Sequence, residues 1–314
     1  MKTSKTSRPY KGASIIDFPD DYVVLDLETT GLSPEWNSII EIGAIRVESG
    51  MIVDTYQQLV NPGFEIDNFI QSLTGITNEM LSDQPSISAV LPQFEKFIKN
   101  YFVVGHNVNF DVNFLYDNYE YCLNKPFTNG FIDTMRISRK VLPNLSQYRL
   151  IDVVEELGID GSEFHRALSD CEYTYKCYET MKAIIECDFG GYDKFKSLFK
   201  NNYHEKSIDL TKLSPQCESF DETHPLYGKV CVFTGILEQF TREQAAQIVV
   251  NLGGQCGNTV TKKTNFLILG NNDYCSAIKD GKSTKQKKAE AYKLKGQDIE
   301  IIPESVFYEM IKSE

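Results

Sequence analysis

The amino-acid sequence predicts an α/β protein with two domains, and three observations support this. The chain has 314 residues, about the length of two typical domains. Apolar runs typical of strands alternate with segments of helical spacing, the order found in α/β domains. The alternation is lost over residues 187–224 and resumes at Tyr227. We therefore expect a polar N-terminal arm at 1–20, a first domain at 21–186, a linker with a short helix at 187–224, and a small second domain at 225–314.

The expected strands of the first domain are short and apolar. The run "YVVLDLETT" at 22–30 predicts the first strand, and residues 38–62 predict two more that are joined by a turn at Ser49 and Gly50. The segment "YFVVGHN" predicts a buried strand that ends at Gly105. The segment "FIDTMRISRKVLP" predicts a strand that passes into a helix, which stops before Pro143.

Helices are expected between and after these strands. In residues 87–100 apolar side chains recur at helical spacing, and "NFDVNFLYDNYEYCL" at 109–123 predicts a second helix. The segment "RLIDVVEELGI" predicts a helix closed by Gly158, and residues 167–185 predict a long amphipathic helix. The short helix in the linker is expected around 192–199.

The second domain repeats the alternation on a smaller scale. The segment "KVCVFTG" predicts a strand, "REQAAQIVVNLGG" a helix ended by two glycines, and "NFLILG" a second strand. They are followed by a basic helix in "STKQKKAEAYKLKG", a strand in "IEIIP" and a last helix in "SVFYEMIKS". This pattern predicts a second, independent α/β unit.

The charge of the chain is unevenly distributed. The net charge is −12, and residues 21–186 hold 11 basic and 25 acidic residues, whereas residues 225–314 hold 12 and 10. An acidic first domain favours solubility, and it also fits a cluster of carboxylates that needs cations. It argues against tight nonspecific nucleic-acid binding by that domain alone, because phosphate affinity comes from Lys and Arg.

The sequence gives an expectation for the cellular compartment. None of the eight cysteines forms a C-x-x-C pair, which argues against a zinc site. No apolar segment of a signal peptide follows the N-terminal lysines, and no run approaches the length of a membrane span. We therefore expect reduced thiols, a cytoplasmic location and no membrane partner.

Two carboxylates interrupt the first predicted strand. Asp26 and Glu28 are two residues apart, so they project from one face of the strand, about 6–7 Å apart. A buried strand does not tolerate two unpaired carboxylates. Either cations neutralise them, or the strand has one face in water, which Leu25 and Leu27 on the other face would also fit.

Three further residues have the chemistry of a hydrolytic site. Asp111 stands at the start of a predicted helix, where by itself it could simply bind free backbone N–H groups. His165 and Asp170 are five residues apart, so one shared helix face is not expected. We place His165 on the loop before the helix that carries Asp170, where a lone histidine is typically a surface residue.

Taken together, these residues outline a two-metal hydrolytic site. Two cations about 3.5–4 Å apart can polarise a phosphodiester, lower the pKa of an attacking water and stabilise the leaving oxygen. Hard oxygen ligands favour Mg²⁺ or Mn²⁺. A histidine with a pKa near neutral can accept the proton of the water.

The segments "DLETTG", "GHNVNFD" and "HRALSD", in this order and spacing, resemble the three exonuclease motifs of the DEDDh family. The resemblance covers about 22–185 and extends to the proofreading exonucleases of bacterial replicative polymerases, the epsilon type. The segment "LTGITNEML" supports it, because a Gly-Ile-Thr segment lies between the first two motifs of those enzymes. Thr74 departs from the pattern, since many relatives have histidine there. The resemblance implies a ribonuclease-H-like fold, with a mixed sheet flanked by helices.

The resemblance also implies catalytic roles. Asp26, Glu28 and Asp170 would bind two divalent cations, Mg²⁺ or Mn²⁺, with Asp26 bridging both. Asp111 would complete the metal set mainly through a water molecule. His165 would be the general base.

Substrate contacts follow from the same resemblance. Thr29, Gly31 and Leu32 stand where the family holds the 3′-terminal nucleotide. Asn107 and Phe110 are further candidates for substrate contact. His106, beside them, is interpreted as a turn histidine bonded to backbone.

The second domain contains a dense group of lysines. Seven lie within 17 residues: Lys279, Lys282, Lys285, Lys287, Lys288, Lys293 and Lys295. Such a group is either a solvated helix face or a phosphate-binding site. The end of the strand in "VFTG" offers Thr234 and the Gly235 N–H, and Arg242 opens a helix whose N-terminus favours anions.

This region resembles a BRCT domain of the single-copy kind found in bacterial DNA ligases and the large clamp-loader subunit. The matching features are "GKVCVFTG", the "LGG" turn, "VTKKTNFLILG" and the Lys-rich helix start. Phe307 stands where many BRCT domains have tryptophan. In members that bind DNA ends, residues matching Thr234, Gly235, Arg242 and Lys285 hold a phosphate, with Lys288 as a near alternative.

Three functions remain in competition. The first is a metal-dependent 3′→5′ exonuclease that acts on single-stranded or frayed 3′ ends of DNA and releases 5′-mononucleotides. It would work in proofreading or repair, acting in trans with a replicative polymerase or a repair protein, because no polymerase motif is present. The second is an exoribonuclease of the same fold, acting on RNA or short oligonucleotides, since 2′-OH recognition depends on pocket details. The third is a scaffold that binds nucleic acid without cleaving it.

Overall fold

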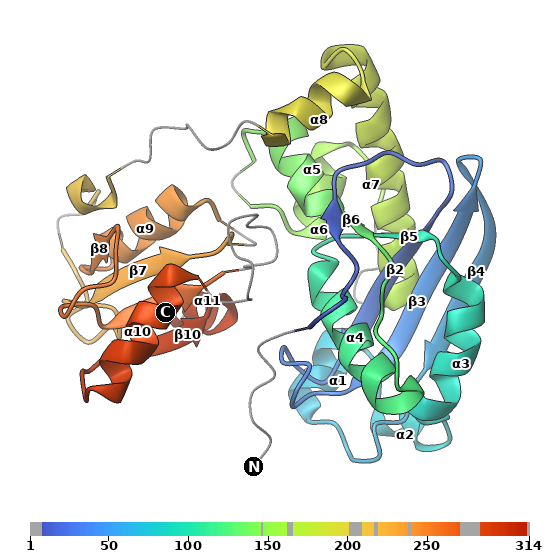
Figure 1. The fold of residues 1–314 in the computed structure, drawn as a ribbon, viewed down its shortest axis with the longest axis horizontal. Coiled ribbons are helices and arrows are strands. Elements are labelled where there is room, and N and C mark those ends of the chain that lie inside the picture. Colours follow the sequence, from blue (N-terminus) through green and yellow to red (C-terminus); the bar gives the residue numbers. More distant parts are fainter. Residues whose placement is uncertain are drawn as a thin grey trace. The chain divides into compact units, whose positions relative to one another are not determined.

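The computed structural model of the chain (Figure 1) describes residues 8–145, 147–161, 166–200, 209–216, 219–237, 240–270 and 283–312. The chain divides into two compact units, Met1–Asn202 and Tyr203–Glu314. Within the described ranges, no helix is both long enough and apolar enough to cross a membrane.

The first unit is built on a mixed sheet. In chain order its strands are β1 (Ser14–Ile15), β2 (Tyr22–Thr29), β3 (Ile39–Glu48), β4 (Met51–Leu59), β5 (Phe102–Gly105) and β6 (Phe131–Asp133). They lie in the order β1-β6-β5-β2-β3-β4. The four strands β1, β6, β5 and β2 are parallel to one another, whereas β3 is antiparallel to both β2 and β4. Strand β2, which carries Asp26 and Glu28, therefore lies inside the sheet.

Helices flank this sheet (Figure 1). They are α1 (Asn68–Thr74), α2 (Asn78–Ser82), α3 (Ile87–Ile98), α4 (Asn109–Leu123), α5 (Thr134–Val141), α6 (Leu150–Glu156), α7 (Ala167–Asp188) and α8 (Tyr192–Lys200). The α/β class that the sequence predicts, a mixed sheet flanked by helices, is confirmed for this unit.

The alternation of side chains along β2 assigns helices to the two faces of the sheet. Tyr22 and Val24 pack in one core cluster with residues of α5, α6 and α7. Leu25 points to the other face, in register through β3 with Tyr56 of β4. Tyr56 contacts the rings of two phenylalanines of α3. Asp26 and Glu28 share the even-numbered face, so they point toward the side covered by α7.

The stretch expected as a polar arm contributes to the first unit over its described part, residues 8–20. Strand β1 pairs in parallel with β6, and Phe18 is buried in the same core cluster as α7. The Arg8 guanidinium makes two hydrogen bonds, of 2.9 and 2.8 Å, with the Asp117 carboxylate on α4. A two-residue strand has no pattern of its own and is defined only by its partner.

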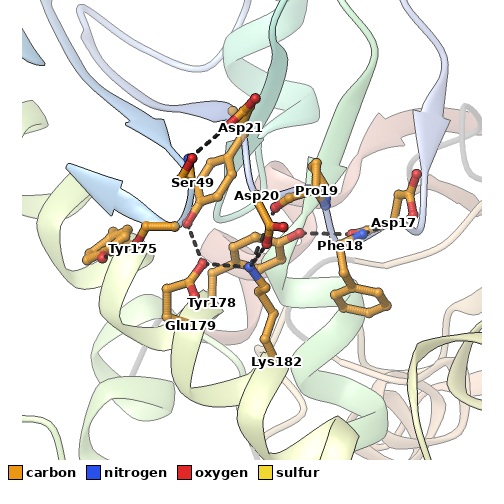
Figure 2. A network of polar contacts seen from close by, with 12 residues as sticks. Asp17, Phe18, Pro19, Asp20, Asp21, Ser49, Tyr175, Tyr178, Glu179 and Lys182 are labelled. Atoms are coloured by element: carbon orange, nitrogen blue, oxygen red, sulfur yellow. Dashed lines mark hydrogen bonds and ion pairs between the residues drawn. The ribbon is translucent and has the colours of Figure 1, made fainter. Parts of the chain in front are cut away.

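The C-terminal half of α7 is tied to the start of β2, as Figure 2 shows. Lys182 is 6% exposed and donates to Glu179 Oε1 at 3.0 Å. The Tyr22 hydroxyl donates to the same oxygen at 2.7 Å. The Tyr178 hydroxyl donates to the Asp17 carbonyl at 2.9 Å. These contacts fix one end of α7 against the sheet.

The short helix expected at 192–199 is present as α8. Phe195 is fully buried in the core cluster that contains α7 residues. Its ring packs edge-on against Phe189 and Phe199. Helix α8 thus packs with the first unit, while the domain boundaries themselves stay a prediction.

The second unit is a smaller α/β layer structure. Its elements are a 3₁₀ turn η1 (Leu210–Lys212), β7 (Val230–Thr234), α9 (Arg242–Asn251), β8 (Gln255–Gly257), β9 (Phe266–Leu269), α10 (Thr284–Leu294), β10 (Glu300–Pro303) and α11 (Glu304–Lys312). The sheet order is β10-β9-β7-β8, with all neighbours parallel. Phe233 packs with α9 and α11, whereas Val232 packs with Ala289 of α10, so helices cover both faces.

Candidate active site

The strand β2 presents two carboxylates to α7. In register with β3, Asp26 lies opposite Gly43 and Glu28 lies opposite Glu41. The pairing shifts by one residue directly after Glu28, so the bulge ends the regular ladder just beyond the second carboxylate. The face predicted from the spacing of Asp26 and Glu28 is therefore the face on which α7 packs.

The third carboxylate comes from the first turn of α7. Asp170 is 9% exposed. Each of Asp26, Glu28 and Asp170 offers a carboxylate oxygen, and these oxygens all lie within 4.8 Å of one another. Asp170 thus lies beside Asp26 and Glu28, although more than 140 positions separate it from them in the sequence.

Asp111 lies beside this group, at the start of α4. It is 4% exposed, and its Oδ1 accepts a hydrogen bond of 3.0 Å from the backbone N–H of Leu27, between the two β2 carboxylates. Its charge raises the pKa of Asp26. The set of three oxygens within 4.8 Å does not include Asp111.

Burial among like charges raises the pKa of these acids. For Asp26 burial is the largest cause, and the charges of Asp111 and Glu28 follow. For Glu28 burial is again the largest cause, the charge of Asp170 is next, and the pKa rises to about 8. The pKa of Asp111 also rises, mainly through burial. Acids held together against their own repulsion gain most from a bound cation.

The residues present fit a divalent cation. All donors in the group are carboxylate oxygens, the hard ligands that Mg²⁺ and Mn²⁺ take. They converge from a strand and two helix starts, so the backbone holds them rigidly. Asp26, Glu28 and Asp170 are placed to bind an ion directly, and Asp111 lies next to them.

The predicted general base, His165, lies outside the described residues. The described chain resumes at Arg166, which is the N-cap residue of α7. Arg166, the next residue in the chain after His165, is thus the first described residue that follows it.

Of the predicted nucleotide-binding residues, Thr29 is the last residue of β2, and Gly31 and Leu32 lie on the loop that follows. The Thr29 hydroxyl donates to the Gly31 carbonyl at 2.8 Å. A Cβ added at Gly31 would lie 2.6 Å from the Asn37 side-chain amide and would have to displace it. Leu32 is 59% exposed. All three follow Glu28 within four residues of the chain.

Asn107 and Phe110 lie between β5 and the first turn of α4. Asn107 adopts a left-handed backbone with φ 60°, and its N–H donates to Asp133 Oδ1 at 3.0 Å. The Phe110 ring packs against Phe114. His106 bonds the Tyr148 carbonyl at 2.7 Å, so its interpretation as a turn histidine bonded to backbone is confirmed.

Two residues that the sequence analysis missed complete the site, Glu41 and Arg166. Glu41 is fully buried, and its carboxylate forms a two-point ion pair with the Arg166 guanidinium, at 2.8 and 3.1 Å. Burial opposes ionisation of Glu41, yet its pKa is lowered, because Arg166 and other donors stabilise the charge. The signal was present: Glu41 interrupts the apolar run "SIIEIGAI" just as Asp26 interrupts its own strand.

In the second unit, four of the five predicted phosphate-binding residues meet at the end of β7. Lys285 Nζ donates to the Phe233 carbonyl at 2.9 Å, and the Arg242 guanidinium donates to the Gly235 carbonyl at 2.9 Å. The Thr234 hydroxyl is bonded to Ser283, the N-cap of α10, at 2.8 Å. Burial, and then the charge of Arg242, lower the pKa of Lys285 to about 8.

The fifth residue, Lys288, lies apart from these contacts. It is exposed, and its ammonium lies over the Tyr292 ring, 5.9 Å from the centroid. It stands one turn further along α10 than Lys285.

Comparison with known proteins identifies both units. Residues 23–178 match the family described as Exonuclease (RNase_T), and residues 222–301 match the BRCA1 C Terminus (BRCT) domain. The chain is 38% identical over 186 residues to the DNA polymerase III subunit epsilon of Aquifex aeolicus, a match that spans 58% of this chain and 91% of that relative. The chain belongs to the RNase_T exonuclease family.

A second curated relative and a solved structure are similar over the same part of the chain. The exonuclease domain is 38% identical over 198 residues to a PolC-type DNA polymerase III of Thermotoga maritima, spanning 62% of this chain but 14% of that protein. The solved structure of Exonuclease X in complex with 5′ overhanging duplex DNA superposes with a TM-score of 0.43 at 25% identity, covering 56% of this chain and 98% of that one.

Family membership confirms several predictions made from the sequence. The resemblance to DEDDh and epsilon-type exonucleases, the ribonuclease-H-like fold and the C-terminal BRCT domain are confirmed. The enzyme class, a 3′→5′ exonuclease, is confirmed as well. The family uses divalent metal ions. The identity and number of the ions, and the roles of individual residues, stay predictions.

Proposed function

We propose that this RNase_T exonuclease uses two divalent cations, Mg²⁺ or Mn²⁺, to remove 5′-mononucleotides from single-stranded or frayed 3′ ends of DNA. The observation that carries this proposal is the meeting of Asp26, Glu28 and Asp170 within 4.8 Å, with Asp111 beside them. A bound cation would relieve the mutual repulsion of these closely placed acids in their ionised form.

The protein's own residues have distinct tasks in this mechanism. Asp26, Glu28 and Asp170 would hold the cations, since their carboxylate oxygens lie together, and Asp111 lies beside them, bonded to the Leu27 N–H. When bound, the cations polarise the phosphodiester, activate water and stabilise the leaving oxygen. His165 is the proposed base that accepts the proton of the attacking water.

The loop after β2 and the start of α4 form the proposed substrate contacts. Thr29, Gly31 and Leu32 follow the metal ligands directly, and the exposed Leu32 side chain offers an apolar surface for the terminal base. Asn107 and Phe110 lie within four residues of Asp111, at the start of α4.

The DNA substrate is supported by the relatives rather than by the site. The relative matched over 91% of its length is named as a subunit of DNA polymerase III, and the chain also carries a BRCT domain. We propose that the BRCT domain binds a DNA-end phosphate through Thr234, Gly235, Arg242 and Lys285, with Lys288 as the near alternative. A replicative polymerase or repair protein as partner, and the cytoplasmic location, belong to the same proposal.

The test is a time course on 5′-labelled and 3′-labelled single strands of DNA and of RNA with matched sequence. Mg²⁺, Mn²⁺ and chelator are compared, together with the Asp26→Ala variant. Glu156→Ala, which removes an exposed carboxylate of α6, is the matched control. We expect 5′-labelled DNA to shorten as a ladder with metal and with Asp26 present, and the control to behave as the wild type.

Each contrary outcome has a definite meaning. Faster degradation of RNA than of DNA would replace the proposed substrate with the exoribonuclease alternative. Binding of DNA without cleavage under any metal condition would leave a non-cleaving scaffold. Equal activity of the Asp26→Ala protein would contradict the assignment of the site.

A further inference from the structure

Glu41 on β3 makes an unusually complete set of contacts for a buried carboxylate. Its side chain is 0% exposed. It accepts hydrogen bonds from Arg166 Nη2 at 2.8 Å, Arg166 Nε at 3.1 Å, the Ala167 backbone N–H at 3.1 Å and Gln57 Nε2 at 2.9 Å. Three of these four bonds go to the residues that begin α7. A charge removed from water in this way is stable only while its partners are in place.

The same short region of β3 also contacts α7 through its backbone. Gly43 lies so close to α7 that an added Cβ would lie 2.3 Å from the Ala167 carbonyl carbon. The Cys171 thiol donates to the Gly43 carbonyl at 3.3 Å. The first turn of α7, which carries Asp170, is thus pressed onto β3 and bonded there by Glu41.

The position of these contacts connects them to the acids of the site. In register, Glu41 lies directly opposite Glu28, and Gly43 lies directly opposite Asp26. One face of the β2–β3 ladder therefore holds two of the site's carboxylates on β2 and the anchor of the third on β3. Moving the start of α7 would move Asp170 away from Asp26 and Glu28 without touching either.

We propose that Glu41 is a positioning residue: through Arg166 and Ala167 it holds the start of α7 so that Asp170 stays within reach of Asp26 and Glu28, and it thereby sets the affinity for divalent cations. The inference rests on the proposed metal site. We assign Glu41 no direct contact with cation or substrate, because both of its carboxylate oxygens already accept hydrogen bonds from protein donors.

The test measures cation binding separately from catalysis, on the full chain. Mn²⁺ affinity is determined by calorimetry, with the thermal midpoint Tm measured with and without Mn²⁺, for wild type and Glu41→Gln. We expect the Mn²⁺ Kd to rise by about 10–100-fold, the range found for residues that orient metal ligands. The Mn²⁺-induced gain in Tm should shrink. In the nuclease assay, kcat should fall while KM for the oligonucleotide stays within about twofold, as expected when a change leaves substrate binding intact.

A matched control separates positioning from loss of stability. Asp117→Asn breaks the two-point ion pair with Arg8, six residues further along α4 than Asp111. This variant should lower Tm but keep the wild-type Mn²⁺ affinity. Arg166→Met should reproduce the rise in Mn²⁺ Kd seen in Glu41→Gln. The double variant should have a Kd no higher than that of the single variant that binds Mn²⁺ less tightly, because both changes act through one contact.

The outcomes distinguish this inference from the proposed function. If the wild-type protein binds no Mn²⁺, the metal site itself is wrong. If the wild type binds Mn²⁺ and Glu41→Gln binds it equally well, the positioning role is overturned while the site stands. A rise in KM for Arg166→Met without a change in Mn²⁺ affinity would also overturn it, because Arg166 would then contact the substrate instead.

Discussion

Glu28 is one of the acids whose raised pKa should make the stability of the metal-free exonuclease domain depend on pH. Its pKa rises from 4.5 to about 8, first through burial and then through the charge of Asp170. A carboxyl with a raised pKa binds its proton more tightly in the folded state than in the unfolded state. The free energy of unfolding without metal should therefore fall as pH rises from about 4.5 to about 8.

Bound cations should reverse this trend, because they stabilise the ionised carboxylates. We predict that Mg²⁺ raises Tm by several degrees at pH 8 and by much less at pH 5.5, where protons compete for the same oxygens. Thermal unfolding at the two pH values, with Mg²⁺ and with chelator, measures this. An equal gain at both values would mean that Glu28 does not take part in binding.

Asp170 gives a second prediction at the scale of one residue. Asp170→Asn removes a charge that raises the pKa of both Asp26 and Glu28. Without metal, the variant should be more stable than the wild type at pH 8, because repulsion is relieved. Its exonuclease rate should fall by more than about 100-fold, the upper range for outer partners of metal ligands. A lower Tm in chelator would show that Asp170 is a stabilising residue rather than a ligand.

At the scale of elements, the helix α7 is held at both ends. Its start is held by Glu41 and by close contact with Gly43. Its second half is held by the network around Lys182 that Figure 2 shows. The start of α7 should affect both activity and stability, because it lies next to the carboxylates of the site. The second half should affect stability alone.

Gly43→Ala tests the start of α7. The new methyl group would lie 2.3–2.6 Å from backbone atoms of Ala167 and Leu168, so the helix must move. We predict a loss of about 1–3 kcal/mol in the free energy of unfolding and a fall in kcat of about 100-fold, as for a misplacement near 1 Å. In Gly257→Ala, the nearest atom would be a side-chain carbon of Val232 at 3.3 Å, so this control in the second unit should cost less stability and leave kcat unchanged. Unchanged activity in Gly43→Ala would mean that the site tolerates a displaced α7.

Lys182→Met tests the other end. Lys182 lies 12 residues after Asp170, or about 18 Å along the helix at 1.5 Å per residue. Losing its bond to Glu179 should cost about 1–3 kcal/mol of stability, because hydrogen-bonded charged groups are left partly unpaired. The rate constant kcat should not change. The control Lys176→Met replaces an exposed lysine of the same helix and should alter stability by less than about 0.5 kcal/mol. Urea unfolding and the nuclease assay measure both effects.

The sequence predicts an element well when the pattern that forms it lies within the element's own residues. Helix α4 matches its predicted range 109–123, because side chains that are buried in the fold recur along most of its length. Strands β1 and β8, of two and three residues, were not predicted, and each is defined by its pairing with β6 or β7. The equally short β6 was predicted, within the segment that passes into α5. The short helices α1 and α2 depend on caps, Asp67 and Thr77, which are clear only once the chain is folded.

The candidate site divides in the same way. The common face of Asp26 and Glu28 follows from the period of a strand. That Asp111 and Asp170 join them depends on tertiary packing, so the sequence supplied this only through a family resemblance. Glu41 was missed because its partner Arg166 is 125 residues away, and a buried carboxylate is recognised as paired only when that partner is seen.

At the scale of the whole molecule, the chain joins an acidic exonuclease domain to a BRCT domain rich in lysine. An acidic surface repels the DNA that the exonuclease must approach. A second domain that binds DNA-end phosphate would raise the local concentration of 3′ ends without any change in the active site. Substitution of Lys285 tests whether the BRCT domain binds DNA ends while the exonuclease domain cleaves them.

Lys285→Ala in the full chain should abolish the preference for 5′-phosphorylated over unphosphorylated duplex ends, measured by fluorescence anisotropy. We expect a loss of about tenfold, because a charged hydrogen bond contributes about 1.5–3 kcal/mol. In the wild type, the preference should weaken as pH rises through about 8, the pKa of Lys285, since the neutral amine no longer attracts phosphate. Hydrolysis of short single strands should stay within about twofold, because the exonuclease acids are untouched.

The control Lys293→Ala removes an exposed lysine of the same helix. If it reduces the preference as much as Lys285→Ala does, the lysines of α10 act as a diffuse charged face, and the assignment of a phosphate site to the end of β7 is wrong.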